Sequence, residues 1–159
     1  MDFDTLYERY ARDVYRFALY LSGREDIADD ISAETFVRAW LSPQPIREGT
    51  VKAYLFAIAR NLYRADRRRE ARVDALSDAW PSSRPSPEAS AAARLDLARI
   101  LARLQQLPEV DRAVLLMRAE DDMSYEEIAA AVGISPGAAK VKVHRARVRL
   151  MQLERQEEI

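Results

Sequence analysis

The sequence predicts an all-α protein built from two small helical domains joined by a flexible linker. Apolar residues recur at the spacing of one helix face in several long segments, and strand-like alternation is absent throughout. Residues 74–92, which are rich in proline and serine, interrupt this pattern and are typical of a linker. We therefore expect one domain at residues 1–73 and another at residues 93–159, each with only a modest core of its own.

The composition argues against an enzyme. The chain has 159 residues and no cysteine, and its 1 histidine, His144, cannot form a histidine dyad or cluster. None of its 4 glycines has the spacing of a phosphate-binding loop. We therefore expect no catalytic residue, no metal and no cofactor. The lack of cysteine fits a reducing cytoplasm, and no segment reads as a membrane span or a signal peptide, so we expect a cytoplasmic protein without membrane insertion.

The first domain begins with two amphipathic helices. Residues 3–21 place apolar side chains on one face, namely Leu6, Tyr10, Val14, Phe17 and Leu21. A second helix is predicted from Glu25 to Leu41, with a packed side formed by Ile27, Ile31, Phe36, Val37 and Trp40. Its outer side carries Asp29, Asp30, Ser32, Ala33, Glu34 and Arg38. Charge alone leaves two interpretations of this acidic side, a solvated face or a surface for a partner.

A long third helix is predicted for residues 51–72, because Pro43 and Pro45 end the second. Its inward stripe is Leu55, Ile58, Ala59 and Leu62, with Tyr54, Arg60 and Asn61 near or beyond the stripe edges. Tyr63 and a cluster of arginines complete this helix, so that aromatic and basic side chains are interleaved along it. Together they suit an unstacked single strand, since flat rings contact bases and cations contact phosphates. Aromatic residues at helical spacing are also typical of a core, so residue types alone leave both interpretations open.

The second domain ends in a predicted helix-turn-helix. Amphipathic helices at 94–107 and 109–121 precede it. Ser124 and Glu127 then form a capping-box pattern, and Gly133 stands where a helix end needs left-handed backbone. Ser135 caps the last helix, and Pro136 fits its first position. The acidic tail at 152–159 is expected to fray.

The last helix carries basic residues and no acidic one between Pro136 and Leu150. At about 100° per residue, Ala139, Val143, Ala146 and Leu150 form one stripe toward the core. The opposite ridge is Val141, His144 and Arg145, flanked by Lys140 and Arg147 on one side and by Lys142 and Arg149 on the other. This layout suits a helix in a DNA major groove, with the ridge at base edges and the flanks at phosphates. The alternative is a solvated amphipathic helix with a basic face.

Three segments in order resemble a bacterial sigma factor of the extracytoplasmic-function (ECF) group of the sigma-70 family. They are DIADDISAETFVRAW, AYLFAIARNLYRADRRR and LPEVDRAVLLMRAEDDMSYEEIAAAVGISPGAAKVKVHRARVRL, and with the linker they cover nearly the whole chain. Members of this group keep only the second and fourth sigma domains. The resemblance implies that residues 1–73 bind core RNA polymerase and open the minus-ten DNA, and that residues 93–159 read the minus-thirty-five DNA.

The resemblance also implies roles residue by residue. Contacts to the clamp helices of the polymerase β′ subunit fall on Asp29, Asp30, Glu34, Phe36, Arg38 and Trp40, with Phe36 and Trp40 expected to pack rather than make polar contacts. The minus-ten set is Ile46, Arg47, Tyr54, Arg60, Asn61, Arg64, Arg67 and Arg68. The minus-thirty-five set is Lys140, Val141, Lys142, His144, Arg145, Arg147 and Arg149. The chain departs from the family pattern at several positions. Ala33 replaces a usual Gln, Ile46 is not the aromatic residue of some members, and Tyr54 stands where Trp is frequent. Val141 replaces an often polar residue, and residues 136–139 lack the usual Thr-Val pair.

We therefore expect an alternative sigma factor with three kinds of partner: core RNA polymerase, through its β′ clamp helices and β flap, promoter DNA, and an anti-sigma factor. One alternative is a helix-turn-helix regulator that acts without replacing a sigma factor. This alternative leaves the acidic helix and Asn61 unexplained. Another is a helical adaptor or antagonist that binds polymerase without supporting transcription, against which the intact basic helix argues.

Overall fold

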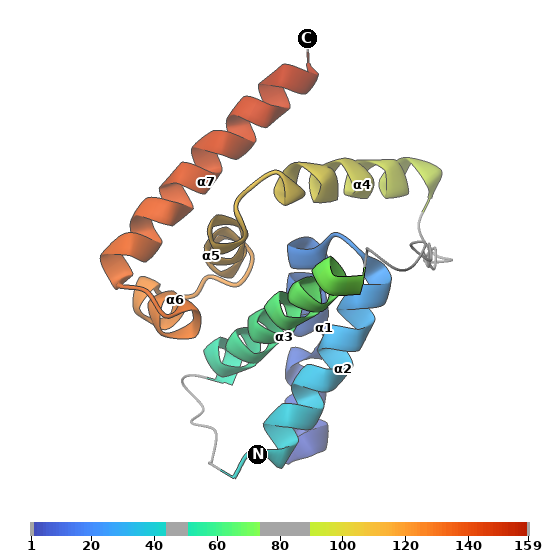
Figure 1. Cartoon of the computed structure of the whole chain (residues 1–159), viewed down its shortest axis with the longest axis vertical. Helices are drawn as coiled ribbons and strands as arrows, with labels where there is room; N and C mark the ends of the chain where they lie inside the picture. The colour runs from blue at the N-terminus through green and yellow to red at the C-terminus, as the bar shows by residue number, and fades with distance from the viewer. Residues whose placement is uncertain (1, 44–50, 74–89, 159) are drawn as a thin grey trace. The chain divides into compact units, whose positions relative to one another are not determined.

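A computed structural model describes residues 2–43, 51–73 and 90–158. The described residues form α-helices and no strand, as the sequence predicts, and the chain divides into two compact units, residues 1–85 and 86–159. The first unit contains α1 (Phe3–Ser22), α2 (Glu25–Leu41) and α3 (Val51–Val73). The second contains α4 (Ala91–Gln105), α5 (Glu109–Ala119), α6 (Tyr125–Val132) and α7 (Pro136–Glu157) (Figure 1).

The first unit is a bundle in which α1, α2 and α3 all contact one another. At its centre the rings of Phe17 and Phe56 stack with centroids 4.5 Å apart, and both side chains are buried. The apolar face predicted for residues 3–21 is confirmed, with Tyr10 at its half-buried edge. Helix α1 begins at the Asp2 cap, whose carboxylate accepts a hydrogen bond from the Thr5 N–H at 2.8 Å.

The packed side predicted for the second helix is partly wrong. Val37 and Trp40 are 48% and 56% exposed. The core side of α2 holds instead the small or polar residues Ala28, Thr35 and Ala39 beside Ile27, Ile31 and Phe36. Thr35 is tolerated there because its hydroxyl donates to the Ile31 carbonyl oxygen at 2.6 Å. The hydrophobic pattern misled because large apolar side chains lie on the outer face of this helix.

Helix α5 forms the core of the second unit and contacts α4, α6 and α7. Val114 and Met117 are fully buried on it. The buried Arg112 guanidinium donates to the carbonyl oxygens of Leu107, at 2.9 Å, and Leu104, at 3.4 Å. Leu104 lies in the last turn of α4 and Leu107 just beyond it, so Arg112 ties the end of α4 to α5.

The expectation that residues 152–159 fray is wrong for most of the tail, because α7 continues to Glu157. Leu153 is buried, and the Arg103 side chain of α4 reaches the end of α7. Its Nε donates to Glu157 at 2.8 Å, and its guanidinium lies 3.8 Å from the Glu154 carboxylate. Contacts with α4 therefore stabilise the last turns of α7, which helix propensity alone would leave frayed.

The helix-turn-helix has the predicted caps. Ser124 Oγ accepts from the Glu127 N–H at 3.1 Å, and the Glu127 carboxylate accepts from the Ser124 N–H at 3.2 Å. Gly133 adopts φ +81°, and its N–H donates to the Ala129 carbonyl oxygen. Ser135 caps α7 by accepting from the Ala138 N–H at 3.1 Å. These local devices fix the angle at which α7 leaves the turn.

Candidate nucleic-acid interface

Helix α7 is anchored along one stripe and exposed along the other. Ala139, Val143 and Ala146 are 0% exposed, as the helical wheel predicts, and Leu150 is half-buried at the end of the stripe. On the outer ridge Val141 is 63% exposed, and His144 and Arg145 are exposed as well. The flanking basic residues are also accessible, with Lys140, Arg147 and Arg149 exposed and Lys142 half-buried.

One residue of the outer ridge has a partner that the sequence did not indicate. Arg145 donates from Nε to Asp111 Oδ2 and from Nη2 to Asp111 Oδ1, both at 2.8 Å. The Asp111 side chain on α5 is only 3% exposed, while the Arg145 side chain is 57% exposed. The hydrogen bond and the charge of Asp111 raise the pKa of the Arg145 guanidinium. The sequence analysis did not identify Asp111. An acidic residue on the same helix face as Val114 and Leu115 nevertheless indicates a buried carboxylate that needs a basic partner.

The entry to the helix-turn-helix is held by Arg118 near the end of α5. Its guanidinium lies 4.5 Å from the ring centroid of Tyr125, the first residue of α6. Its Nη1 also donates to the Met123 carbonyl oxygen at 2.8 Å. Arg118 therefore ties the loop before α6 to α5 and limits how far the two helices can move apart.

The third helix presents only part of the surface that the sequence predicts. Asn61, Arg64, Arg67 and Arg68 are exposed, and Tyr54 is half-buried. Arg60 corrects the expectation, because it is only 4% exposed and its guanidinium lies inside the first unit. A phosphate contact from Arg60 would need the side chain to leave the core. Ile46 and Arg47 lie outside the described residues.

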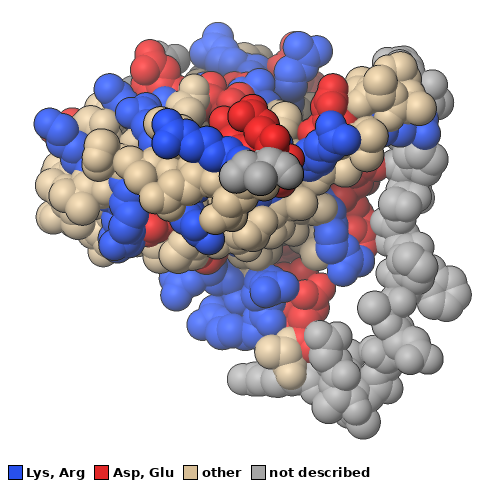
Figure 2. All heavy atoms as spheres, turned by 90° about the horizontal axis from the view of Figure 1, so that it is seen from above, with Lys and Arg blue, Asp and Glu red and all other residues tan. Residues whose placement is uncertain are grey.

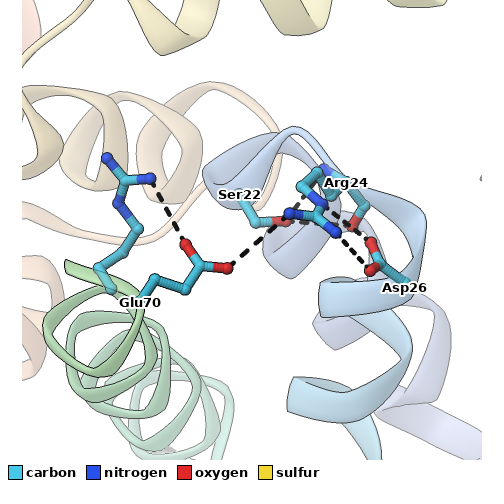
Figure 3. A network of polar contacts seen from close by, with 5 residues as sticks. Ser22, Arg24, Asp26 and Glu70 are labelled. Carbon is cyan, nitrogen blue, oxygen red and sulfur yellow. Dashed lines mark hydrogen bonds and ion pairs between the residues drawn. The ribbon is translucent and has the colours of Figure 1, made fainter. Parts of the chain in front are cut away.

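The end of α3 is tied to the connection between α1 and α2 (Figure 3). Arg24 forms a two-point contact with Asp26, at 3.1 and 2.7 Å, and lies 3.8 Å from Glu70 on α3. Glu70 also lies 3.8 Å from Arg67. The hydrogen bond to Asp26 raises the pKa of Arg24, and the charges of Asp26 and Glu70 add to this effect. This network orients the turn of α3 that carries the exposed arginines.

The outer side of α2 is acidic, as predicted, with Asp29, Asp30 and Glu34 exposed. Arg38 is exposed and pairs with Glu34 at 3.1 Å across one turn. An open pocket of about 620 Å³ lies between α2 and α3, and its lining includes Asp30, Glu34, Arg38, Asn61 and Arg69. The acidic residues of α2 and the polar residues of α3 thus share one surface.

Aromatic residues surround the exposed end of α2. Phe36 is buried, whereas the exposed Trp40 meets the edge of Phe3 with centroids 5.5 Å apart. Tyr7 packs on Phe36 at 5.1 Å and remains 48% exposed. The pocket beside them, about 520 Å³, reaches Tyr15, whose pKa is raised by burial and by Asp29 and Glu25. Exposed rings beside a groove are typical of a surface that another protein covers.

The electrostatic character of the chain is mixed. The net charge is −1, and on the face in Figure 2 basic and acidic side chains are interspersed. Within the described residues no group of His, Asp and Glu could hold a metal ion. Among the described residues, no helix combines the length and the apolarity that crossing a membrane requires.

An exposed basic helix on an anchored helix-turn-helix is typical of DNA-binding proteins, and an exposed acidic and aromatic face is typical of a surface that binds another protein. Comparison with known proteins identifies the class. Residues 6–73 match the family model "Sigma-70 region 2", and residues 97–150 match "Sigma-70, region 4". The chain therefore belongs to the sigma-70 family of RNA polymerase sigma factors, and its relatives place it in the ECF group.

Two relatives and one solved structure illustrate this similarity. The chain is 35% identical over 159 residues to the ECF RNA polymerase sigma factor SigL of Mycobacterium tuberculosis, covering 96% of this chain and 88% of that one. It is 34% identical over 152 residues to the ECF sigma factor SigE of Mycolicibacterium smegmatis, covering 92% of this chain and 59% of SigE, which is longer. The sigma factor RpoE of Bartonella quintana, solved with the anti-sigma factor NepR, superposes with a TM-score of 0.79 at 30% identity, over 97% of both chains.

Proposed function

We propose that this chain is an alternative sigma factor that binds core RNA polymerase and directs it to a two-part promoter. The single observation that carries the proposal is the geometry of α7, whose stripe of Ala139, Val143 and Ala146 is fully buried while its basic ridge is exposed. A helix held in this way fits a major groove at the minus-thirty-five element. Val141 suits a thymine methyl group, and Lys140 suits guanine acceptors.

The minus-ten element would be bound by α3 and the residues that precede it. Exposed Asn61 and the exposed arginines Arg64, Arg67 and Arg68 are suited to the sugar-phosphate backbone of an opened strand. Opening the duplex requires no covalent chemistry, because contacts to unpaired bases and phosphates offset the lost stacking. We therefore propose that the chain contributes binding to transcription initiation and carries out no reaction of its own.

The first unit would dock on polymerase through the outer side of α2. Asp29, Asp30 and Glu34 supply polar contacts there, and Trp40 supplies exposed apolar surface. Exposed apolar and aromatic surface beside polar groups is typical of a protein interface. We propose that the β′ clamp helices of polymerase bind this face and that the β flap binds the second unit. This binding would take place in the cytoplasm.

We also propose that an anti-sigma factor holds the chain inactive. The similar RpoE structure contains the anti-sigma factor NepR, which supports this control here. In the described residues both units carry exposed large apolar side chains, including Trp40 in the first and Ile100 and Met151 in the second. A protein that covers these side chains would block polymerase from the same surfaces.

The proposal is tested by run-off transcription with purified core polymerase on a library of promoter-like DNA, with and without this chain. Transcripts that start at a fixed distance from a shared two-part motif are the expected result. Binding to core without any transcript would instead identify an antagonist. Sequence-specific binding to duplex DNA that polymerase does not change would identify an ordinary regulator.

A further inference from the structure

Asp111 lies on α5, outside the helix-turn-helix, yet both of its carboxylate oxygens are engaged by the outer ridge of α7. Oδ1 and Oδ2 each accept one hydrogen bond from Arg145 at 2.8 Å. The Asp111 side chain is 3% exposed, so its charge depends on Arg145 for compensation. Asp111 stands in the first turn of α5, where a negative charge is also favoured by the helix dipole.

The geometry of the pair leaves one edge of the guanidinium unoccupied by Asp111. The Asp111 carboxylate takes the edge formed by Nε and Nη2. The other edge, formed by Nη1 and Nη2, points away from the carboxylate because the guanidinium is planar. The Arg145 side chain is still 57% exposed although Asp111 is buried. A side chain this exposed can offer its remaining N–H donors to a partner outside the unit.

Two parallel donors at the end of an arginine match the O6 and N7 acceptors of guanine in the major groove. A free arginine must give up side-chain freedom to make this contact, which reduces the affinity gained. An arginine already fixed by a two-point contact to a buried carboxylate has given up that freedom on folding. Fixing Arg145 in advance therefore raises both its affinity for guanine and its ability to reject other bases.

We propose that Asp111 is a positioning residue that holds Arg145 in place to read one guanine of the minus-thirty-five element. The inference rests on the proposed promoter function and adds a specificity determinant to it. Asp111 itself touches no DNA and acts only through Arg145. The flanking Arg147 and Arg149 have no such support from the described residues and serve as phosphate contacts of low sequence preference.

The test measures base preference in holoenzyme, by run-off transcription from promoters randomised in the minus-thirty-five element. The expected result for the original chain is a strong guanine preference at one position. Arg145→Ala removes that preference, and Asp111→Asn reduces it about tenfold at the same position while leaving the other positions unchanged. The double variant behaves as Arg145→Ala alone, because Asp111 acts only through the guanidinium.

A matched control separates positioning from a general change in charge. Glu126→Gln also removes one negative charge from the helix-turn-helix, at an exposed position in the first turn of α6. It is expected to raise binding to all sequences equally and to leave every base preference unchanged. Thermal unfolding of each free variant fixes a temperature at which all of them are folded.

Two results would overturn the inference. One is an Asp111→Asn variant that lowers transcription equally on all sequences, which would make the pair a purely structural contact. The other is an Arg145→Ala variant with an unchanged preference at every position. The same variants are also passed through selection on randomised duplex DNA without polymerase, so a chain that failed as a sigma factor would still report whether Asp111 controls what Arg145 reads.

Discussion

Replacing Trp40 with alanine is expected to weaken binding to core RNA polymerase beyond its effect on the fold. The Trp40 side chain is 56% exposed, and its only ring contact in the described residues is the edge of Phe3 at 5.5 Å. An edge-to-face pair is worth about 0.5–1.5 kcal/mol. The pair comes in addition to area burial, and the part of the residue that is already covered, about 110 Å², is worth up to about 2.8 kcal/mol at about 25 cal/mol per Å². Trp40→Ala should therefore cost the first unit up to roughly 3–4 kcal/mol of folding free energy.

The effect on binding follows from the surface that a partner would cover. A tryptophan has about 250 Å² to bury, and at 56% exposure roughly 140 Å² remains for a partner. At about 25 cal/mol per Å² this area corresponds to roughly 3.5 kcal/mol as an upper limit. Incomplete burial reduces this value, so we expect a loss of about 2–3 kcal/mol, or roughly 30- to 150-fold in affinity.

The measurement is displacement of a fluorescently labelled original chain from core polymerase by unlabelled variants. Trp40→Phe is the matched control, because it keeps a ring at the same position and should lose only a fraction of the affinity. Thermal unfolding of the free variants is measured alongside. An affinity of Trp40→Ala within threefold of the original chain, at a temperature at which both are folded, would refute the reasoning.

Further predictions concern the fold. Phe56→Ala removes the ring stacked on Phe17 and should cost about 3–5 kcal/mol in urea unfolding of the first unit, and a loss below 1 kcal/mol would contradict the core described above. Gly133→Ala should cost about 1–2 kcal/mol from backbone strain alone, because φ is +81° and an added Cβ meets nothing within 4 Å; thermal unfolding checks this, and an unchanged midpoint would argue against the left-handed turn. The hydrogen bond from Arg103 lowers the pKa of Glu157 below its ordinary 4.5, so the pair stabilises the end of α7 at neutral pH and is lost as the pH falls through that lowered pKa. Hydrogen exchange in the last turn of α7 should therefore speed up on acidification in the original chain but not in Glu157→Gln, and equal pH dependence in both would count against the pair.

Features set by neighbouring residues could be read from the sequence. The capping box of Ser124 and Glu127, the left-handed Gly133 and the Ser135 cap each depend on groups within four positions in the chain. The buried stripe of α7 was also predictable, because its period is that of a single helix in contact with one core. Signals between neighbouring residues were therefore enough to predict the helix-turn-helix and the orientation of its basic ridge.

Features set by distant residues could not be read in this way. Asp111 and Arg145 are 34 positions apart, and Arg103 and Glu157 are 54 positions apart. The burial of Arg60 and the exposure of Trp40 depend on how α1, α2 and α3 pack against one another, which periodicity within one helix does not encode. Periodicity therefore predicted which face of α7 is buried, but not the burial of Arg60 or the exposure of Trp40.

The distribution of exposed apolar side chains explains how a nearly neutral chain could be both selective and easy to inhibit. The first unit exposes Val37, Trp40 and Leu41, and the second exposes Leu95, Ile100, Val148 and Met151. Each surface alone is small, so each contact with polymerase should be weak. Joined by a linker, the second contact forms at an effective concentration of about millimolar, and the two together bind far more tightly than either. An antagonist that covered only the surface of the first unit would remove this gain, and with it most of the affinity for polymerase, without needing to contact α7.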